Sequence, residues 1–282
     1  MPDFAERFLA LAAARSPLCL GLDPSVELLR AWGLPDTAEG VRRFCGTVLE
    51  AAGERIAVVK PQSGFFERLG PAGMAELAWA VGQVRAQGAL SLVDAKRGDV
   101  AGTMAGYAAG FAGPDSGFGG DAVTVSAYLG FDALRPVLDR AAAAGAAVFV
   151  VVHSSNLDGR ALQSARHPDG RTVSEALADQ ITAYNSARGA GVGPVGAVVG
   201  ATLRPTDATI LDRLPASLIL APGVGPQGAS LADVGVRFRR ALSRTLPSVS
   251  RAVLQYGPDP AALRDALDRY RDTAWAAVTA GG

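Results

Sequence analysis

The chain has 282 residues, 49% of them hydrophobic and 19% charged, and its 27 basic and 27 acidic residues give a formal net charge of zero. This length is enough for one large hydrophobic core or two modest ones. A neutral chain has no overall field to attract nucleic acid or an anionic membrane, so we expect neither partner, and local charge must hold any anionic ligand.

Eight short aliphatic runs predict eight strands. Most of them are continuously apolar rather than alternating, which is typical of parallel strands covered on both faces. In chain order the predicted strands are Leu18–Leu22, Arg55–Val59, Leu90–Val93, Ala122–Val125, Ala147–Val152, Val195–Val199, Leu218–Leu220 and Val249–Leu254.

The segments between these runs carry apolar residues at helical spacing. Examples are Met74, Leu77, Ala78, Val81 and Val84, then Val173, Leu177, Ile181 and Tyr184, and finally Leu263, Leu267 and Tyr270. Eight alternations of strand and helix predict an α/β fold, a (β/α)8 TIM barrel. An open doubly wound sheet is the alternative, because periodicity does not show closure. Since no linker or break in composition divides the chain, we expect a single domain over residues 1–282.

Polar side chains gather where the predicted strands end. In a barrel of parallel strands, the C-terminal strand ends face the active site. Asp23, Lys60, Asp94 with Lys96, and Ser154 with Ser155 follow the first, second, third and fifth runs, a glycine-rich turn follows the seventh, and Arg251 lies within the eighth. The sequence therefore predicts a functional site at this rim.

The densest group of charges is residues 94–99, Asp-Ala-Lys-Arg-Gly-Asp. Residues two apart on a strand share a face, so Asp94 and Lys96 should be neighbours. Together with the charged residues after the two preceding strands, they form an alternating array that could hold a lysine protonated in a water-poor site. The alternative is a structural ion pair, with Asp99 capping the next helix.

A second motif is residues 221–228, Ala-Pro-Gly-Val-Gly-Pro-Gln-Gly, which contains GxGxxG by letter. A dinucleotide-binding fold needs this pattern after the first strand, with an acidic residue about 20 positions later. Here it follows the seventh run, and no carboxylate lies between Asp233 and Asp259. A phosphate site after strands seven and eight of a barrel fits better, held by backbone N–H groups, Gln227 and Arg251. An ordinary turn and a surface arginine are the alternative.

Other features argue against a metal site, a disulfide framework and membrane insertion. Cys19 and Cys45 are the only cysteines, and His153 and His167, the only histidines, are not at ligand spacing. We therefore expect no metal ion and no disulfide framework. The longest apolar stretch, residues 141–152, is shorter than the roughly 20 residues that span a bilayer. No signal peptide is evident, so a cytoplasmic location is expected.

Four motifs in order resemble the orotidine 5′-phosphate decarboxylase family, in its longer bacterial second type. The resemblance extends from about Arg15 to Tyr256. The motifs are residues 21–25 (Gly-Leu-Asp-Pro-Ser), 60–67 (Lys-Pro-Gln-Ser-Gly-Phe-Phe-Glu), 94–99 and 221–228, and residues 250–252 (Ser-Arg-Ala) resemble the family's phosphate-binding arginine strand. The resemblance implies a cytoplasmic homodimer that converts orotidine 5′-phosphate to UMP and CO2 in pyrimidine biosynthesis without a cofactor.

The resemblance also implies which residues would act at the reacting carbon. Lys96 would donate a proton to C6 of the pyrimidine, and Asp94 would lie beside the substrate carboxylate. Lys60 and Asp99 would complete the charge array. Asp99 would come from the partner subunit, and Thr103 matches a position that also crosses the dimer interface.

The remaining matched residues would bind the rest of the substrate. By the resemblance, Asp23 would bind the ribose hydroxyls, Ser155 the pyrimidine ring, and Gln227 and Arg251 the 5′-phosphate. The family often has threonine where this chain has Ser154. The choice between the two serines therefore stays open.

Two other classes of function compete with this interpretation. Other barrel lyases, such as metal-dependent sugar-phosphate aldolases, share an Asp-x-Lys-x-x-Asp strand end but need Mg²⁺, and a Schiff-base aldolase would use a lysine as nucleophile. A phosphate-sugar binding protein is the non-enzyme alternative. Carboxylates facing an anion argue against mere binding.

Overall fold

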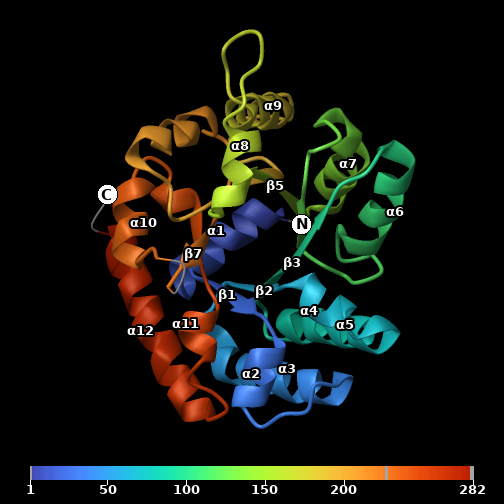
Figure 1. The fold of residues 1–282 in the computed structure, drawn as a ribbon, viewed down its shortest axis with the longest axis vertical. Coiled ribbons are helices and arrows are strands. Elements are labelled where there is room, and N and C mark those ends of the chain that lie inside the picture. The colour runs from blue at the N-terminus through green and yellow to red at the C-terminus, as the bar shows by residue number, and fades with distance from the viewer. Residues whose placement is uncertain (1, 226–227, 280–282) are drawn as a thin grey trace.

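Within residues 2–225 and 228–279, which the computed structural model describes, eight parallel strands form a closed barrel (Figure 1). Pairing of Cys19 with Ser248 and of Leu20 with Val249 joins the first strand to the last. The predicted barrel is therefore confirmed, and the open sheet is excluded. The strands are β1 (Cys19–Leu22), β2 (Val58–Pro61), β3 (Leu90–Arg97), β4 (Ala122–Val125), β5 (Ala147–His153), β6 (Val195–Val199), β7 (Ile219–Val224) and β8 (Thr245–Val249).

Helices lie around the strands (Figure 1). They are α1 (Phe4–Ala14), α2 (Val26–Ala31), α3 (Ala38–Ala52), α4 (Ser63–Glu67), α5 (Gly70–Ala86), α6 (Ala101–Phe111), α7 (Arg135–Ala144), α8 (Arg160–Gln163), α9 (Val173–Ser186), α10 (Leu231–Arg237), α11 (Arg251–Leu254) and α12 (Pro260–Thr279). Short 3₁₀ turns occupy Gly53–Arg55, Asp132–Leu134, Leu157–Gly159, Pro205–Arg213 and Leu242–Arg244. The three predicted apolar stripes lie on α5, α9 and α12.

Two predicted strands were misplaced. The eighth was predicted at Val249–Leu254, but β8 ends at Val249, and Arg251 begins α11 instead of lying within a strand. The second was predicted at Arg55–Val59, but Gly53–Arg55 forms a 3₁₀ turn and β2 continues to Pro61. At the eighth strand the predicted run crosses into a short buried helix, and apolarity alone does not separate the two. At the second strand, Ile56 and Ala57 are buried before β2 begins.

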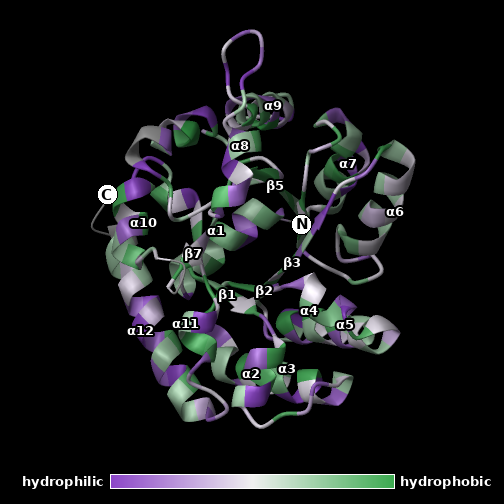
Figure 2. Cartoon of the chain, in the orientation of Figure 1, coloured by the Kyte–Doolittle hydropathy of each residue, from purple (hydrophilic) through white to green (hydrophobic). Residues whose placement is uncertain are grey.

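The strands turn alternate residues into the barrel and toward the helices, with a period of two. The inward residues nearer the N-terminal end are apolar and belong to one buried cluster, which includes Val58, Leu92, Ala122 and Leu246. Two residues further along the same strands, the inward positions are Lys60, Asp94, Thr124 and Ser248, all buried. The barrel interior therefore changes from apolar to polar toward its C-terminal end. Figure 2 shows hydrophobic residues in the strands and mixed hydropathy along helices such as α12.

Helix α1 packs against the apolar end of the barrel and lies across the centre of the ring in Figure 1. The Phe4 and Phe149 rings meet edge to face, with centroids 5.9 Å apart. Arg7 donates to Oδ1 of the buried Asp121 at 2.8 Å, and Asp121 Oδ2 accepts the Ser91 N–H and hydroxyl, each at 2.9 Å. This end of the barrel is packed, which leaves the polar C-terminal end for a ligand.

No helix in the described ranges combines the length and the apolarity that a bilayer crossing requires.

Candidate active site

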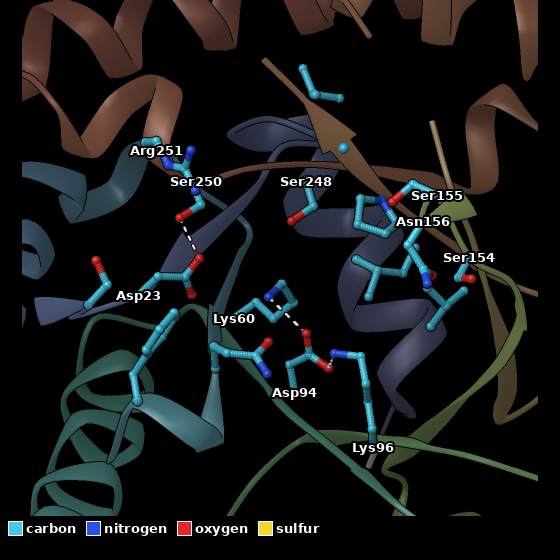
Figure 3. A pocket seen from close by; sticks show the side chains of 18 of the residues that line it. Asp23, Lys60, Asp94, Lys96, Ser154, Ser155, Asn156, Ser248, Ser250 and Arg251 are labelled. Carbon is cyan, nitrogen blue, oxygen red and sulfur yellow. Dashed lines mark hydrogen bonds and ion pairs between the residues drawn. The ribbon is translucent and has the colours of Figure 1, made fainter. Parts of the chain in front are cut away.

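A cavity of about 430 Å³ lies at the polar, C-terminal end of the barrel (Figure 3). Its lining comes from the ends of seven strands, all except β4, and from the loops that follow them. Six of the predicted site residues line it, namely Asp23, Lys60, Asp94, Lys96, Ser155 and Arg251. The site is thus assembled from segments far apart in the sequence, as the strand-end positions predicted.

Three charged side chains form a continuous chain in the cavity (Figure 3). Lys60 Nζ lies 3.1 Å from Asp94 Oδ2, and Lys96 Nζ lies 2.6 Å from Asp94 Oδ1. The Lys60 and Asp94 side chains are 7% and 10% exposed, whereas that of Lys96 is 49% exposed. Asp94 and Lys96 are therefore neighbours, as predicted, and the Lys96 ammonium group lies at the accessible side of the pair.

The charges set one another's protonation. Burial raises the pKa of Asp94, but the positive charges of Lys60 and Lys96 and the hydrogen bonds from Lys96 and Thr124 outweigh it, so the pKa lies well below its ordinary value. Burial lowers the pKa of Lys60, but the carboxylates of Asp94 and Asp23 outweigh that effect and raise it above its ordinary value. Asp94 is therefore a carboxylate, and Lys60 an ammonium, at neutral pH.

Thr124 was not predicted as a site residue. It lies in β4 and is fully buried, and its Oγ1 donates to Asp94 Oδ1 at 2.7 Å and accepts the Lys96 N–H at 3.0 Å. The signal in the sequence is a single hydroxyl residue within an aliphatic strand, two residues after Ala122. That signal is weak, because the strand is apolar on both faces and its phase cannot be determined from the sequence.

Asp23 follows β1 and is held by the residue before Arg251. Ser250 Oγ donates to Asp23 Oδ2, while Asp23 Oδ1 is buried and has no hydrogen-bond partner among the described residues. Gly21 permits this approach, because a Cβ there would lie 2.6 Å from Ser250 Cβ. A buried carboxylate oxygen without a partner requires a donor, and a ligand hydroxyl would supply one.

The loop after β5 places Ser154, Ser155 and Asn156 along one wall of the cavity (Figure 3). Gln163 of α8 donates to Ser154 Oγ at 2.7 Å and accepts the Ser154 N–H at 3.0 Å. A Cβ on Gly200 would lie 2.7 Å from the Ser155 nitrogen. The loop is therefore fixed from both sides, by α8 and by the end of β6.

Arg251 lies across the cavity from Lys96 (Figure 3), beside Gly223 and Val224 at the end of β7. Gly223 and Gly225 have φ angles of 104° and 99°, which side chains rarely adopt. The Arg251 guanidinium thus offers this side of the cavity a positive charge for an anion. The N–H groups of Gly225 and Gly228 bind carbonyl groups within the loop. Gln227, the other predicted phosphate ligand, lies outside the described residues.

Asp99 and Thr103 are not part of the described lining of this cavity. Asp99 Oδ1 accepts the N–H of Val100 at 2.7 Å, but the N-cap of α6 is Val100 rather than Asp99. The alternative role of Asp99, as the N-cap of this helix, is therefore excluded. Thr103 is exposed on the first turn of α6.

His153 ends β5 and is half-buried, and burial lowers its pKa. In the described part of the chain, no group of three or more His, Cys, Asp or Glu side chains is arranged to hold a metal ion.

Comparisons with known proteins agree with this geometry. A model of the orotidine 5′-phosphate decarboxylase / HUMPS family matches residues 16–266. Orotidine 5′-phosphate decarboxylase of Myxococcus xanthus is 50% identical over 268 residues, or 95% of this chain and 93% of that protein. The enzyme of Salinispora tropica is 48% identical over 279 residues, or 99% of each chain.

Solved structures show the same similarity. A candidate orotidine 5′-phosphate decarboxylase from Streptomyces avermitilis has a TM-score of 0.94 at 45% identity, covering 99% of this chain and 97% of its own. OMP decarboxylase of Leishmania donovani has a TM-score of 0.79 at 32% identity, covering 96% and 98%. The resemblance found in the four sequence motifs is confirmed, and the chain belongs to the orotidine 5′-phosphate decarboxylase / HUMPS family.

Proposed function

We infer that the chain converts orotidine 5′-phosphate to UMP and CO2 in pyrimidine biosynthesis, with Lys96 as the proton donor to C6. Identity of 50% to a relative of that name over 95% of the chain supports the activity. The observation that carries the assignment of Lys96 is the Lys60–Asp94–Lys96 chain of charges, with the Lys96 ammonium on the accessible side.

The reaction breaks the bond between C6 and the carboxylate, and the electron pair remains on C6 as CO2 leaves. No neighbouring group delocalises this pair, so charge stabilisation must come from the site. A unit charge pair about 4 Å apart at an effective dielectric of about 20 is worth about 4 kcal/mol. Since enzymes supply roughly 8–23 kcal/mol, several groups must act together. The Lys96 proton then moves to C6, and water reprotonates the amine.

Asp94 orients the Lys96 ammonium toward the reacting carbon. Asp94 Oδ1 is 2.6 Å from Lys96 Nζ, while Oδ2 is held by Lys60. A fixed carboxylate also lies where the substrate carboxylate must enter, so charge repulsion there is relieved as CO2 departs. Both effects favour the transition state over the bound substrate.

The remaining residues orient the rest of the nucleotide. Arg251 and the loop after β7, with Gln227, bind the 5′-phosphate, and the unpartnered Asp23 Oδ1 accepts a ribose hydroxyl. Ser155 contacts the pyrimidine, because the Ser154 hydroxyl is held by Gln163. Binding energy from the phosphate, remote from C6, fixes the ring at Lys96.

The enzyme functions as a homodimer in which Asp99 and Thr103 enter the cavity of the partner subunit. Two observations support this arrangement. Neither residue belongs to the described lining of its own cavity, and exposed large hydrophobic side chains follow the neighbouring strands β3, β4 and β5, namely Val100, Tyr128, Leu129 and Leu157. An apolar rim beside a functional site is typical of a subunit interface.

Residues 1–282 act as one barrel domain in the cytoplasm. The family model covers residues 16–266, and α1, which precedes them, packs into the barrel end. No cofactor or metal takes part in this proposal.

Substitution of Lys96 tests the assignment. Lys96→Ala and Lys96→Arg should both abolish measurable loss of orotidine 5′-phosphate absorbance, because arginine keeps the charge but is a very poor proton donor at neutral pH. Lys96→Arg should still bind UMP, as measured by calorimetry. Near wild-type turnover in either variant would refute the role of Lys96, and wild-type enzyme without decarboxylation would refute the activity.

A further inference from the structure

We propose that Thr124 is a positioning residue for this reaction: its hydroxyl group fixes the Asp94 carboxylate and the Lys96 backbone in the arrangement that brings the two charged side chains together. The inference rests on the roles proposed above for Asp94 and Lys96. Thr124 is fully buried and is not part of the described lining of the cavity, so it acts through these two residues rather than on the substrate.

The backbone of β3 leaves its regular pairing where the charged residues lie. Val93 pairs with Val123 of β4, and the next pair is Arg97 with Val125. Residues 94–96 therefore stand opposite Thr124 alone, as in a β-bulge. Lys96 has a φ of 47°, a conformation that residues other than glycine rarely adopt. Something outside the regular ladder must hold the chain there.

The Thr124 hydroxyl supplies that restraint. The Lys96 N–H donates to Thr124 Oγ1 at 3.0 Å. Thr124 Oγ1 lies 2.7 Å from Asp94 Oδ1. A backbone N–H can only donate and a carboxylate can only accept, so the direction of both hydrogen bonds is fixed: the hydroxyl hydrogen points to Asp94 and an oxygen lone pair faces Lys96.

The backbone and the side-chain end of Lys96 are consequently held by the same small hydrogen-bond network. Its backbone N–H binds Thr124, and its Nζ lies 2.6 Å from Asp94 Oδ1, the oxygen that Thr124 also holds. The other oxygen, Asp94 Oδ2, accepts from Lys60 at 3.1 Å. The hydroxyl thus decides which carboxylate oxygen faces which lysine. Its loss should misplace the Lys96 ammonium relative to C6 while leaving the phosphate and ribose contacts intact.

Thr124→Val removes the hydroxyl and keeps the branched shape, whereas Thr124→Ser keeps the hydroxyl. We expect Thr124→Val to lower kcat about 10- to 100-fold, the effect of losing a hydrogen bond to a charged group, with KM changed less than about threefold. Thr124→Ser should recover most of kcat. A matched control is Thr245→Val, since Thr245 is equally buried and its hydroxyl donates to the Ala241 carbonyl at 2.8 Å, outside the cavity. It should keep wild-type kcat.

Wild-type kcat in Thr124→Val overturns the inference, as does an equal loss of kcat in Thr124→Ser or in Thr245→Val. Unfolding midpoints of all variants are measured in parallel. If valine prevents folding, Thr124→Cys, with a weaker donor, takes its place in the comparison with the same expected result. If Lys96→Ala is inactive and Thr124→Val is normal, only this inference fails; if Lys96→Ala is active, the proposed role of Lys96 fails first.

Discussion

Lys60 and Lys96 are the only lysines in the sequence, and both line the cavity. Elsewhere the basic residues are arginines, including those in the surface ion pairs. Arginine stays protonated and binds carboxylates with two parallel hydrogen bonds, whereas lysine is a compact charge that can release a proton. The two lysines therefore lie only in the cavity, where the proposed mechanism requires a transferable proton and a compact charge.

This distribution makes selective chemical labelling possible. Lys96 is 49% exposed and Lys60 only 7%, so limited reductive methylation should modify Lys96 well before Lys60. Activity should fall in proportion to the modification of Lys96. Bound UMP should slow both the modification of Lys96 and the loss of activity. Peptide mass spectrometry and the absorbance assay measure the two quantities on the same sample. Full activity after modification of Lys96 would contradict its proposed role.

Asp94 should contribute strongly to stability, because it is the counter-ion of a buried lysine. Asp94→Asn leaves Lys60 unpaired and should reduce the free energy of unfolding by about 3–5 kcal/mol at neutral pH. The folded-state pKa of Asp94 lies below its ordinary 3.8. Its contribution is therefore present above about pH 4 and is lost as pH falls through the folded pKa.

The contribution of Lys60 to stability depends on pH in the opposite direction. Its folded-state pKa lies above the ordinary 10.5, so its contribution is complete below that pH and is lost only as pH rises through the folded pKa. Urea unfolding should show a constant gap between wild type and Asp94→Asn from about pH 5 to 9 that narrows below about pH 4. Asp132→Asn, which breaks an exposed pair with Arg135, should change stability by at most about 1 kcal/mol. A gap of that small size for Asp94→Asn would exclude this account.

At the scale of elements, the side chain of Arg97 joins the end of β3 to two helices. The Arg97 guanidinium pairs with Glu67 of α4 and lies 5.5 Å from the Tyr107 ring and 5.6 Å from the Phe111 ring of α6. The Arg97 carbonyl accepts the Ser126 N–H at 2.8 Å. One residue after Lys96, this side chain anchors the segment that leads to Asp99.

Arg97→Leu should reduce stability by about 1–2 kcal/mol, through lost cation–π contacts and packing. Glu67→Gln removes only the ion pair, which is partly exposed, and should cost less than about 1 kcal/mol, falling further in high salt. Urea unfolding of the two variants at low and high ionic strength separates the contributions. Equal losses in both variants would mean that the ion pair, not the rings, stabilises this element.

The sequence predicted elements well where an apolar run coincided with one strand, as in β4 and β6, whose bounds match the prediction. It failed at β8 for two physical reasons. The strand contains Pro247, which cannot donate to the ladder and is rarely expected within a sheet. The apolar run that followed belongs to α11, so Arg251 reaches the cavity from a helix start rather than from a strand.

The charged residues of the site could be predicted from the sequence, whereas its uncharged residues could not. Strand-end positions placed Lys60, Asp94 and Lys96 correctly, because a charge beside a buried strand costs free energy unless a partner or a ligand compensates it. Thr124 was missed, since a hydroxyl has no charge and its orientation depends on the bulge in β3. The Asp23–Ser250 contact joins residues more than 200 positions apart, a pairing that only closure of the barrel produces.

At the scale of the whole molecule, the two ends of the barrel differ in kind. The N-terminal end is sealed by α1, and the C-terminal end carries the cavity and an apolar rim after β3, β4 and β5. Of the two ends of the barrel, the polar end is therefore the one whose interior is open to a ligand. Asp99 and Thr103 follow β3 near that rim and are not in the described lining of the cavity. In the twofold dimer proposed above, each would enter the opposite site.

Mixing of inactive variants tests whether Asp99 acts across the dimer. Lys96→Ala and Asp99→Ala homodimers should each have little activity. After subunit exchange at equal amounts, half of the dimers are mixed. In a dimer with twofold symmetry, each mixed dimer has one site with both native residues. The mixture should therefore have about one quarter of wild-type activity.

The matched control is a mixture of Lys96→Ala with Lys60→Ala. Lys60 and Lys96 contact the same Asp94 within one chain, so every site in a mixed dimer keeps a defect and activity should stay at the level of the parents. Recovery in the first mixture alone means that Asp99 completes the site of the partner subunit. If neither mixture recovers although exchange is verified by native mass spectrometry, Asp99 acts within its own chain, and the two cavities function independently.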